Sequence, residues 1–564
     1  MHVHSLRPRL SVRRPLAFGI VLALGGLAGE ALHAGELDGQ DHTVYAGENA
    51  ETWSLRNGST LTVLAGQTRS IVAHNSTVDL QHALVTRDAG AMQTIQLQGS
   101  SALVAASSDI QSGTLQVFDS STATLRDSSV ALLATGVDFD DLRTIGIEVI
   151  AMTAGDAPEL RLENTDIRVV ANPLKDHFNS GIGISLESGT AWLGVGSSID
   201  ADNVGVLLRG MIDQDAPISL TLNNAHVVSR TGAALQVAPR AGIRSRYYLH
   251  VGNGSTLSGG NGHLLLVSRG MEGGISQPSE TFFTVDDARL NGNITLDRAT
   301  VSGMLEVTLR NGAQVSGQFN GVTRVNIGDT SSAASRWQLT GDSQVGHLEL
   351  SPVSFVDLGP RDGGTFHTLT LDSFNSNNSV LIFNTALSDD TSLTDRLVIH
   401  GDAHGDAYVV VHNAGGLGGQ TADGILLISV GGASDAEFQQ YGRIAGGKYE
   451  YFLLKGEDGN WYLRSGWPHV PQPCDVDLAL PQCEVTLPVE DGVIVDPSLP
   501  EGPDGPDGPD GPDGPDGPDN PVLRPETGAY LANEAVMRQL MRHRAADRHT
   551  VSSDDGLRSW ASVD

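Results

Sequence analysis

Short segments of alternating apolar and polar residues recur from about residue 38 to residue 350, and each is followed by a small polar turn. Trp53 to Val63 (WSLRNGSTLTV) and Leu309 to Val315 (LRNGAQV) are two examples. Alternation with a period of two predicts strands with one buried face. The turns contain Asn, Asp, Ser and Gly, which accept a positive φ or hydrogen-bond their own backbone in a tight corner. The pattern therefore predicts many short strands joined by tight corners.

Two all-β architectures fit such a pattern. A β-sandwich requires hairpin signals roughly every 8–12 residues and a bounded length. A solenoid repeats one strand-turn-strand unit per coil and places insertions in loops. The units here follow one another in a long, irregularly spaced series, which favours a solenoid with stacked Val, Ile and Leu in its core. Asp138 to Leu160 and Ala238 to Tyr248 match the unit poorly, so we predict that they are loops that leave the coil.

The pattern changes between Trp337 and Ser465, where the predicted strands are longer and more apolar. We expect a denser, aromatic-containing region that seals the end of the solenoid. Its predicted strands are Phe366–Leu371, Val380–Phe383, Arg396–Ile399, Ala407–Val411 and Gly424–Ile428.

Residues 1–34 have the features of a signal peptide. Four arginines precede an uncharged apolar stretch from Leu16 to Leu27, and Leu32-His33-Ala34 fits a cleavage site. The apolar stretch is shorter than the ~20 residues that a bilayer span needs. We therefore expect these residues to be removed during export.

Residues 466–525 predict a linker rich in proline and acidic residues. Gly502 to Asp519 repeats Gly-Pro-Asp, and its aspartates would repel one another in a collagen triple helix, so an extended charged spacer is predicted. Cys474 and Cys483 are the only cysteines and are candidates for a disulfide in an oxidising compartment. Tyr530 to Arg542 consists of good helix formers and predicts a short helix within residues 526–564.

The composition narrows the possible functions. The net charge is −32, with 67 acidic residues against 35 Lys and Arg. Nucleic-acid binding relies on clustered Lys and Arg, so the composition argues against a nucleic-acid partner. With 67 glycines and only 5% aromatic residues, the chain favours a narrow aliphatic core over the bulky core of a large α/β enzyme.

An ordered set of phrases runs through the last third of the chain. Trp337 to Val345 (WQLTGDSQV) is followed by Phe366–Leu371, Asp395–Ile399, Val409–Gly415, Tyr449–Tyr451, Trp461–Leu463 and Arg524–Asn533. The first is similar to the W-x-L-T-x-x-S-x-V phrase that opens the conserved C-terminal passenger region of the pertactin-type autotransporters, and the others resemble that family in its order. The resemblance covers roughly Trp337 to Trp560. The N-terminal half resembles the family only in its general pattern of short strands and polar turns.

The resemblance implies a right-handed parallel β-helix passenger, residues 35–336, that reaches the cell surface through an outer-membrane translocator barrel. It also implies that residues 337–465 are an autochaperone region that folds first and templates the other coils. Each coil of a solenoid contacts only its neighbours, so order can propagate from one stable end.

The same resemblance places the start of the translocator barrel near Trp560. Only Ser559 to Asp564 remain there, whereas a barrel needs at least eight strands of about 10 residues. We therefore expect residues 526–564 to supply a linker helix and a truncated start of a barrel. A fragment, a frameshifted gene product and a passenger served by a separate translocator all fit this sequence.

Motifs of two enzyme classes have partial counterparts in this sequence. Gly341-Asp342-Ser343 resembles the nucleophile loop of chymotrypsin-like proteases, but Gln344 follows where that loop has glycine, and a serine nucleophile needs a histidine base. Asn164-Thr165-Asp166 and Asp286-Asp287 resemble carboxylate motifs of polygalacturonases, yet we expect them on coils that are not adjacent. Both lie at predicted turns, where Asn and Asp are common.

The histidines do not predict a metal site. His400 and His404 are four residues apart but flank glycines, which indicates a loop, and we expect the scattered histidines to be solvated. The calcium-binding Gly-Gly-x-Gly-x-Asp repeat is missing, and no cofactor is expected.

The sequence thus predicts a non-enzymatic autotransporter passenger, displayed at the bacterial surface or secreted, that acts as an adhesin or another virulence-associated interaction protein. Its expected partners are the translocator barrel and ligands on host or neighbouring cells. A β-helix polysaccharide hydrolase or lyase is the alternative, followed by a non-functional truncated autotransporter.

Overall fold

The described residues consist of strands, turns and irregular segments. The computed structural model describes residues 34–133, 143–175, 179–210, 216–240, 242–269, 278–328, 333–360 and 364–465, and strands β45 (His549–Ser552) and β46 (Arg558–Ala561). Residues 1–33, the linker with Cys474 and Cys483, and the helix expected at Tyr530–Arg542 lie outside them. A search of the described part for a helix long and apolar enough to cross a bilayer returns none.

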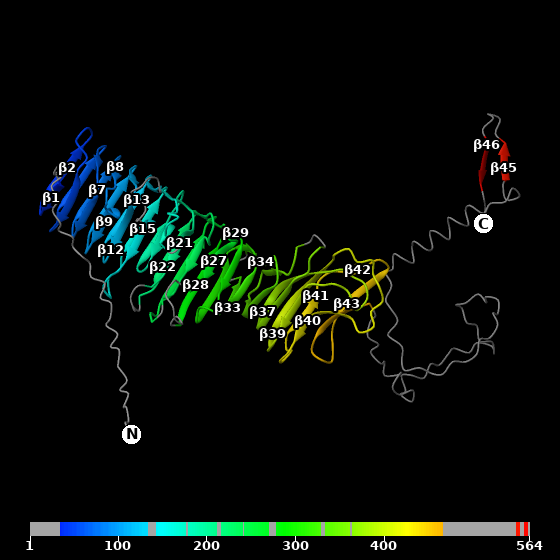
Figure 1. The fold of residues 1–564 in the computed structure, drawn as a ribbon. Coiled ribbons are helices and arrows are strands. Elements are labelled where there is room, and N and C mark those ends of the chain that lie inside the picture. The colour runs from blue at the N-terminus through cyan, green and yellow to red at the C-terminus, as the bar shows by residue number, and fades with distance from the viewer. Residues whose placement is uncertain are drawn as a thin grey trace, which may run out of the picture.

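Each turn of the chain contributes one strand to each of three parallel ladders, and successive coils stack along one axis (Figure 1). The first ladder contains β1 (Ala34–Asp38), β3 (Thr52–Arg56), β6 (Ile71–His74), β9 (Gln93–Gln98), β12 (Thr114–Phe118), β15 (Thr144–Ile150), β18 (Ser180–Leu186), β21 (Val204–Leu208), β24 (Leu235–Val237), β27 (His263–Val267) and β30 (Asn293–Leu296).

The second ladder runs beside the first. It contains β2 (Asp41–Tyr45), β4 (Thr60–Leu64), β7 (Thr77–Gln81), β10 (Ala102–Ala106), β13 (Thr122–Arg126), β16 (Glu159–Glu163), β19 (Thr190–Leu193), β22 (Ile218–Asn223), β25 (Arg246–Gly252), β28 (Ser279–Asp286) and β31 (Gly303–Arg310).

The third ladder has the shortest strands. It contains β5 (Gln67–Thr68), β8 (Leu84–Thr86), β11 (Asp109–Gln111), β14 (Ser129–Leu132), β17 (Asp166–Val169), β20 (Ser198–Ala201), β23 (His226–Ser229) and β26 (Thr256–Gly259), and it resumes with β29 (Arg289–Asn291) and β32 (Gln314–Ser316). Parallel crossovers are almost always right-handed. The fold is therefore the right-handed parallel β-helix that the sequence predicts.

The inward residues of the three ladders form one continuous core from Leu37 to Leu463. Aliphatic residues dominate it because alternating Val, Ile and Leu fill the narrow interior of stacked coils. Trp337 is fully buried, stacks on Phe319 with ring centroids 4.2 Å apart, and donates its indole N–H to the carbonyl of Gly317 at 3.0 Å. The conspicuous phrase at Trp337 is thus part of the core.

Two segments predicted to leave the coil contain coil strands. Thr144–Ile150 forms β15 within Asp138–Leu160, and Arg246–Tyr248 begins β25 within Ala238–Tyr248. The prediction was wrong for β15 because a strand buried on both faces shows no alternation, and alternation was the signal used. It was wrong at Arg246–Tyr248 because the predicted loop extends three residues into β25, a strand that does alternate.

Near the C-terminal end the strands become longer and the first two ladders merge. The first two ladders merge in β33 (Phe319–Ile327), which pairs with both β30 and β31, and β37 (Thr368–Thr385) joins two predicted strands into one. The remaining strands of this region are β34 (Ser335–Gln338), β35 (Ser343–Leu350), β36 (Ser354–Asp357), β38 (Arg396–Ile399), β39 (Ala403–Asn413), β40 (Ile425–Val430), β41 (Glu437–Gln440), β42 (Ile444–Gly446), β43 (Tyr449–Lys455) and β44 (Trp461–Arg464).

The end of the solenoid is closed by antiparallel pairing. β44 pairs antiparallel with β40 and with β43, and β43 pairs antiparallel with β42. A parallel stack always leaves an open edge that could pair with another chain. Turning the last strands back on themselves covers part of that edge, in line with the expectation of an aromatic-containing seal.

The corners between the second and third ladders repeat a left-handed residue. Asn164, Asn224, Asn253, Asp287 and Asn311 have φ between 44° and 54°. Asn and Asp adopt this conformation at lower cost than other residues with a side chain. The Asn/Asp/Gly corners read from the sequence are therefore turns that the coil geometry requires.

Replacing Asn164 tests this requirement. We expect Asn164→Ala to destabilise the fold by about 1–2 kcal/mol, because alanine is strained at positive φ and lacks the side-chain hydrogen bond to Asp127. Asn164→Gly should cost about half as much, since glycine adopts the conformation freely. Urea unfolding followed by circular dichroism measures both. The exposed Arg168→Ala on β17 serves as control, within about 0.5 kcal/mol of wild type. Equal losses in the two Asn164 variants would contradict a conformational role.

Candidate functional surfaces

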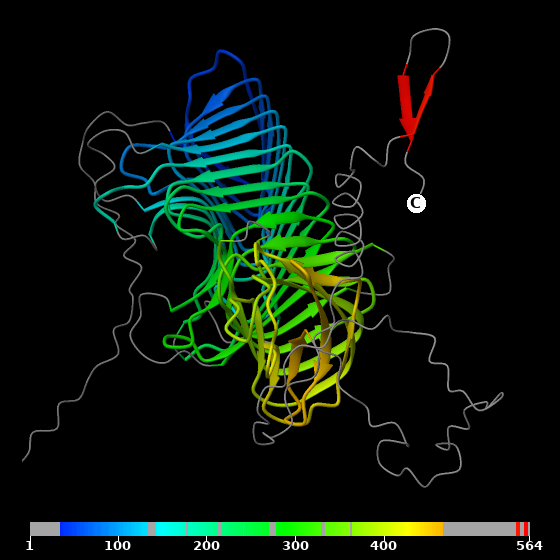
Figure 2. The same cartoon turned by 90° about the vertical axis from the view of Figure 1, so that its right-hand side faces the viewer.

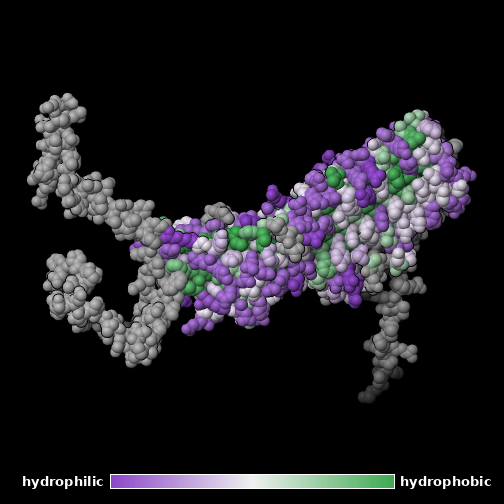
Figure 3. Space-filling view, turned by 180° about the vertical axis from the view of Figure 1, so that it is seen from behind, coloured by the Kyte–Doolittle hydropathy of each residue, from purple (hydrophilic) through white to green (hydrophobic). Residues whose placement is uncertain are grey.

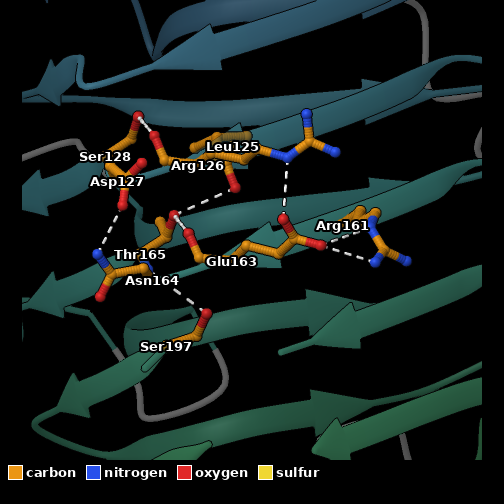
Figure 4. A network of polar contacts seen from close by, with 9 residues as sticks. All are labelled: Leu125, Arg126, Asp127, Ser128, Arg161, Glu163, Asn164, Thr165 and Ser197. Carbon is orange, nitrogen blue, oxygen red and sulfur yellow. Dashed lines mark hydrogen bonds and ion pairs between the residues drawn. The ribbon is translucent and has the colours of Figure 1, made fainter. Parts of the chain in front are cut away.

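Polar side chains at the corners bond from coil to coil (Figure 4). The Asn164 side-chain amide donates to Asp127 Oδ1 at 2.6 Å, and the Asn311 amide donates to Asp286 Oδ1 at 2.7 Å. Beside them, buried hydroxyls form an inner column in which Ser197 Oγ accepts the backbone N–H of Thr165 at 3.4 Å. These groups satisfy backbone donors that a corner would otherwise leave unpaired.

An ion-pair cluster lies on the outward face next to the same corner (Figure 4). Glu163 receives Arg126 Nε at 2.9 Å from the preceding coil and Arg161 Nη2 at 2.7 Å from its own strand. The hydrogen bond from Arg161, followed by that from Arg126, lowers the pKa of Glu163. Because the cluster is exposed, water screens it, and it adds little to stability.

The two carboxylate motifs compared with polygalacturonases lie far apart. Asp166 follows β16 and Asp286 ends β28, and these strands are separated by four steps along the second ladder, through β19, β22 and β25. At about 4.8 Å per step the separation is about 19 Å. Paired glycosidase carboxylates lie roughly 5–9.5 Å apart. Asp286 is also ion-paired with Arg310 Nε at 2.8 Å, so the structure does not bring these acids into one site.

The Gly341-Asp342-Ser343 motif lies in a corner of the coil. Ser343 is buried, donates to the Gly341 carbonyl at 3.2 Å and accepts the backbone N–H of Phe319 at 3.2 Å. Asp342 accepts the backbone N–H of Thr368 at 2.8 Å. Both side chains are engaged with backbone groups of neighbouring coils, which gives them a structural role.

The histidines are not gathered into one place. His226, His400 and His404 are exposed, as predicted. His250 and His263 are half-buried, and burial lowers the pKa of each, so the prediction of solvated histidines was wrong for them. Over the residues that the structure describes, no three His, Cys, Asp or Glu side chains are grouped closely enough to hold a metal ion.

One face of the solenoid is covered by loops. β15, β18 and β21 are buried along their whole length, and the outward column that includes Glu148, Ser185 and Leu207 is buried with them. Loops project to one side of these coils in Figure 2. Elsewhere the outer surface is mostly hydrophilic, with scattered apolar spots on the face shown in Figure 3.

The buried carboxylate of Glu187 connects several segments at the loop-covered face. Glu187 is 1% exposed and accepts Arg209 Nη2 at 2.7 Å and Arg240 Nη2 at 3.3 Å, and Ser185 Oγ donates to it at 3.1 Å. Removing one partner of such a pair strands a buried charge, which costs about 3–5 kcal/mol. Sequence reasoning missed this cluster. The available signal was an acid directly after the non-alternating apolar run of β18.

A second buried carboxylate organises the C-terminal region. Asp395 is fully buried and accepts the backbone N–H of His367, the backbone N–H of Asn384 and the Asn384 side-chain amide, each at 2.8 Å. The Asn384 amide also donates to the Gly359 carbonyl at 3.0 Å. Burial raises the pKa of Asp395, while the hydrogen bonds that it accepts act in the opposite direction. This one side chain ties three separate segments together.

Comparison with known proteins identifies this region. Residues 343–453 match the family Autochaperone Domain Type 1. The match lies inside the 337–465 region defined from the sequence. This match supports the resemblance to autotransporter passengers that the phrases from Trp337 onward carry.

Curated relatives agree with this resemblance. The adhesin BmaC autotransporter of Brucella suis is 30% identical over 52% of this chain and 9% of its own length. The autotransporter adhesin AIDA-I of Escherichia coli is 42% identical over 19% of this chain and 9% of its own. The pertactin autotransporter of Bordetella bronchiseptica is 30% identical over 29% of this chain and 17% of its own. The chain spans about a third or less of the curated relatives it matches.

These matches confirm the resemblance drawn from the sequence. Residues 343–453 match the Autochaperone Domain Type 1 family, and the chain is similar to autotransporters, the pertactin autotransporter among them. The phrase Asp395–Ile399 now has a physical explanation, because Asp395 is the buried acceptor that joins three segments of this domain.

Replacing Asp395 should weaken the autochaperone domain. Asp395→Ala leaves two backbone N–H groups without an acceptor, and we expect a loss of about 2–5 kcal/mol in chemical unfolding. Asp395→Asn keeps the shape and one acceptor and should lose less. A variant as stable as wild type would contradict the role given to this side chain.

The stability difference between wild type and Asp395→Asn should depend on pH. Because the pKa of Asp395 is raised in the folded chain, its contribution to stability is greatest below the unfolded value of about 3.9 and falls as the pH rises through the folded pKa. We therefore expect the stability difference between wild type and Asp395→Asn to narrow from about pH 4 to pH 7. A difference that widens over this range would contradict the raised pKa.

Proposed function

We propose that this chain is a non-enzymatic passenger that is displayed at the bacterial surface and binds components of host or neighbouring cells as an adhesin. Relatives named as adhesins, BmaC and AIDA-I, support this role. The observation that carries the proposal is the engagement of the candidate catalytic side chains. Asp286, Asp342 and Ser343 each bond to residues of their own or adjacent coils, which is a structural task.

The solenoid supplies two kinds of surface for binding. The outer faces of the ladders are long and regular, and the loops over β15, β18 and β21 project from one side. Binding residues are most often found in loops held by a rigid scaffold. The fixed ion pairs of Glu187 give the loop-covered face such a scaffold.

The proposal includes the route to the surface. Residues 1–34 act as a signal peptide, and an outer-membrane translocator barrel is the partner for secretion. The autochaperone region at 343–453 folds first outside the cell in this proposal. The antiparallel strands that seal this end of the stack support that order, because the remaining coils can add to a sealed end one at a time.

Binding to cells tests the main proposal. The purified chain should bind to a panel of epithelial and bacterial cells in a saturable manner, measured by flow cytometry with labelled protein. Heat-unfolded chain at the same concentration is the control. Failure to bind any cell above that control would contradict the adhesin role.

Turnover assays test the enzymatic alternative. We expect no release of reducing sugars or unsaturated products when the chain is incubated with plant and bacterial polysaccharides, and no cleavage of peptide substrates. Product formation that is lost in Asp286→Ala or Asp287→Ala would overturn the non-enzymatic proposal. Asp166→Ala is the matched control, since it lies about 19 Å away along the ladder.

Truncation tests the proposed direction of folding. Removing residues 337–465 should leave the N-terminal coils at least about tenfold slower to refold, because no sealed end remains to template them. Removing the first coils, residues 35–64, should leave the refolding rate of the rest nearly unchanged. Stopped-flow fluorescence after dilution from urea measures both rates. Equal rates in the two truncations would contradict the templating role.

A further inference from the structure

Strand β22 lies between aromatic side chains on the outward face of the second ladder. Its outward side chains are short and polar, namely those of Ser219, Thr221 and Asn223. In register with Thr221, Trp192 lies on the preceding strand β19 and His250 on the following strand β25. Tyr248, also on β25, is in register with Ser219. Aromatic rings therefore flank β22 on both sides, and we call these six residues the β22 strip.

The indole of Trp192 has one covered face and one open face. Arg161 on β16 is in register with Trp192, and its guanidinium carbon lies 3.8 Å from the centre of the ring. The far edge of the ring lies over Gly194, where a Cβ would be 2.1 Å from the indole carbon Cη2. Because Arg161 covers the face toward β16, the opposite face of the indole turns toward β22, where its neighbour in register is the short side chain of Thr221.

The rings on β25 border the strip from the other side. Tyr248 is 43% exposed and stacks on Phe282 of β28 with ring centroids 4.9 Å apart, so its uncovered face is on the side of Ser219. His250 lies over Gly252, where a Cβ would be 2.9 Å from Nε2. Burial lowers the pKa of His250, so its imidazole is neutral at pH 7 and can both donate and accept a hydrogen bond.

The spacing across the strip suits a puckered ring. β19 and β25 are two steps apart along the ladder, which is about 9.6 Å at about 4.8 Å per step. A flat ring held between two faces needs about 7–8 Å, because carbon atoms touch at about 3.5–4.0 Å. A pyranose is thicker than a flat ring, since its carbons are puckered and carry hydrogens on both faces. Its C–H groups are attracted to the negative face of an indole.

The charges around the strip are paired, which disfavours an ionic ligand. Arg161 donates to Glu163 at 2.7 Å (Figure 4), and its guanidinium on the far face of the indole would repel a cation on the near face. Arg310 and Asp286, which both act on the imidazole of His250, pair with each other at 2.8 Å. None of the six strip residues is Lys, Arg, Asp or Glu, and the chain charge of −32 opposes an anion.

The backbone of the strip has no free edge for a peptide strand. Over Ser219–Leu222, β22 pairs with β19 on one side and with β25 on the other. β19 and β25 pair in turn with β16 and β28. Strand addition needs unpaired backbone groups, so this mode of peptide binding is closed here. The hydroxyls of Ser219 and Thr221 and the neutral imidazole of His250 instead offer donors and acceptors that match the hydroxyls of a sugar.

From these observations we infer that the β22 strip binds one ring of a neutral saccharide. The C–H face of the sugar packs on the open face of Trp192, and Tyr248 borders the sugar on the other side. Thr221 and His250 form hydrogen bonds with its hydroxyls. A galactoside and a glucoside share this chemistry. The inference rests on the proposed function, since it gives the adhesin a class of ligand.

Titration of the purified full chain tests the class of ligand. Ligand-observed NMR uses lactose and cellobiose as neutral probes, and digalacturonate, choline and N-acetyltryptophanamide as an anion, a cation and a flat aromatic amide. We expect at least one neutral disaccharide to bind with a Kd on the order of 1 mM, and the other three probes to bind at least about tenfold more weakly. Binding of lactose alone identifies a galactoside, and binding of cellobiose identifies a glucoside.

Matched variants locate the binding. Thr221→Phe fills the strip from an outward position and should weaken the disaccharide at least about tenfold, as should Trp192→Ala. Gly194→Ala displaces the indole without removing a polar group and should also weaken binding. The control Thr62→Phe makes the same exchange at an outward threonine of β4 in the same ladder and should bind as wild type does. Circular dichroism confirms that each variant is folded.

Four results would each overturn the inference. The first is no binding of either neutral disaccharide at about 20 mM. The second is equal or tighter binding of the anion, the cation or the aromatic amide. The third is unchanged binding by Thr221→Phe or by Trp192→Ala. The fourth is a loss in Thr62→Phe as large as that in Thr221→Phe.

Cell binding separates this inference from the adhesin role. If the chain binds cells but binds neither disaccharide, and Thr221→Phe binds cells as wild type does, the saccharide site is wrong while the adhesin role stands. If a disaccharide binds at the strip but the chain binds no cells, the site stands and the adhesin role fails.

Discussion

Stacking of parallel strands in register over one shared core is the constraint on which this structure depends. Every coil must turn at the same places as its neighbours, because the backbone hydrogen bonds of each strand are made to the coils before and after it. The corners therefore fall in columns, and their residues are chosen by backbone conformation. Asn164, Asp287 and Asn311 are left-handed for this reason, and the side chains of Asn164 and Asn311 donate hydrogen bonds to the preceding coil.

This constraint explains what could be predicted from the sequence. The solenoid could be predicted from alternation and polar corners, because a buried face with a period of two and a left-handed corner both leave a local signal in the sequence. The C-terminal region could be predicted from the phrases that begin at Trp337. Strands buried on both faces leave no such signal. β15 was for that reason taken as part of a loop. The partners of Glu187 could not be predicted either, since Arg209 and Arg240 come from later coils and meet it only after the chain has wound around.

The two ends of the solenoid cover the core and the outermost strands in different ways. At the N-terminal end Trp53 packs against Gly35, where a Cβ would lie 2.3 Å from the indole ring, and stacks with His42 at 4.8 Å. The core is covered there by side chains, while within the described part of the chain β1 and β2 each pair with a strand on one side. At the C-terminal end β42, β43 and β44 add antiparallel backbone pairing and a network around Asp395. The C-terminal end has more ways to be stable without a neighbouring coil.

A repeating surface has little capacity to recognise one ligand, since each coil offers nearly the same backbone and small polar side chains. Recognition therefore requires places where the repeat is interrupted. The strands β25 and β28 begin after loops and carry outward Arg246 and Glu280, which lie in register and form an ion pair between the two coils. Regular strands fix the positions of these side chains, and the preceding loops bring Arg244 beside them. Rigidity from the stack and chemical variety from its interruptions are both needed for a specific binding surface.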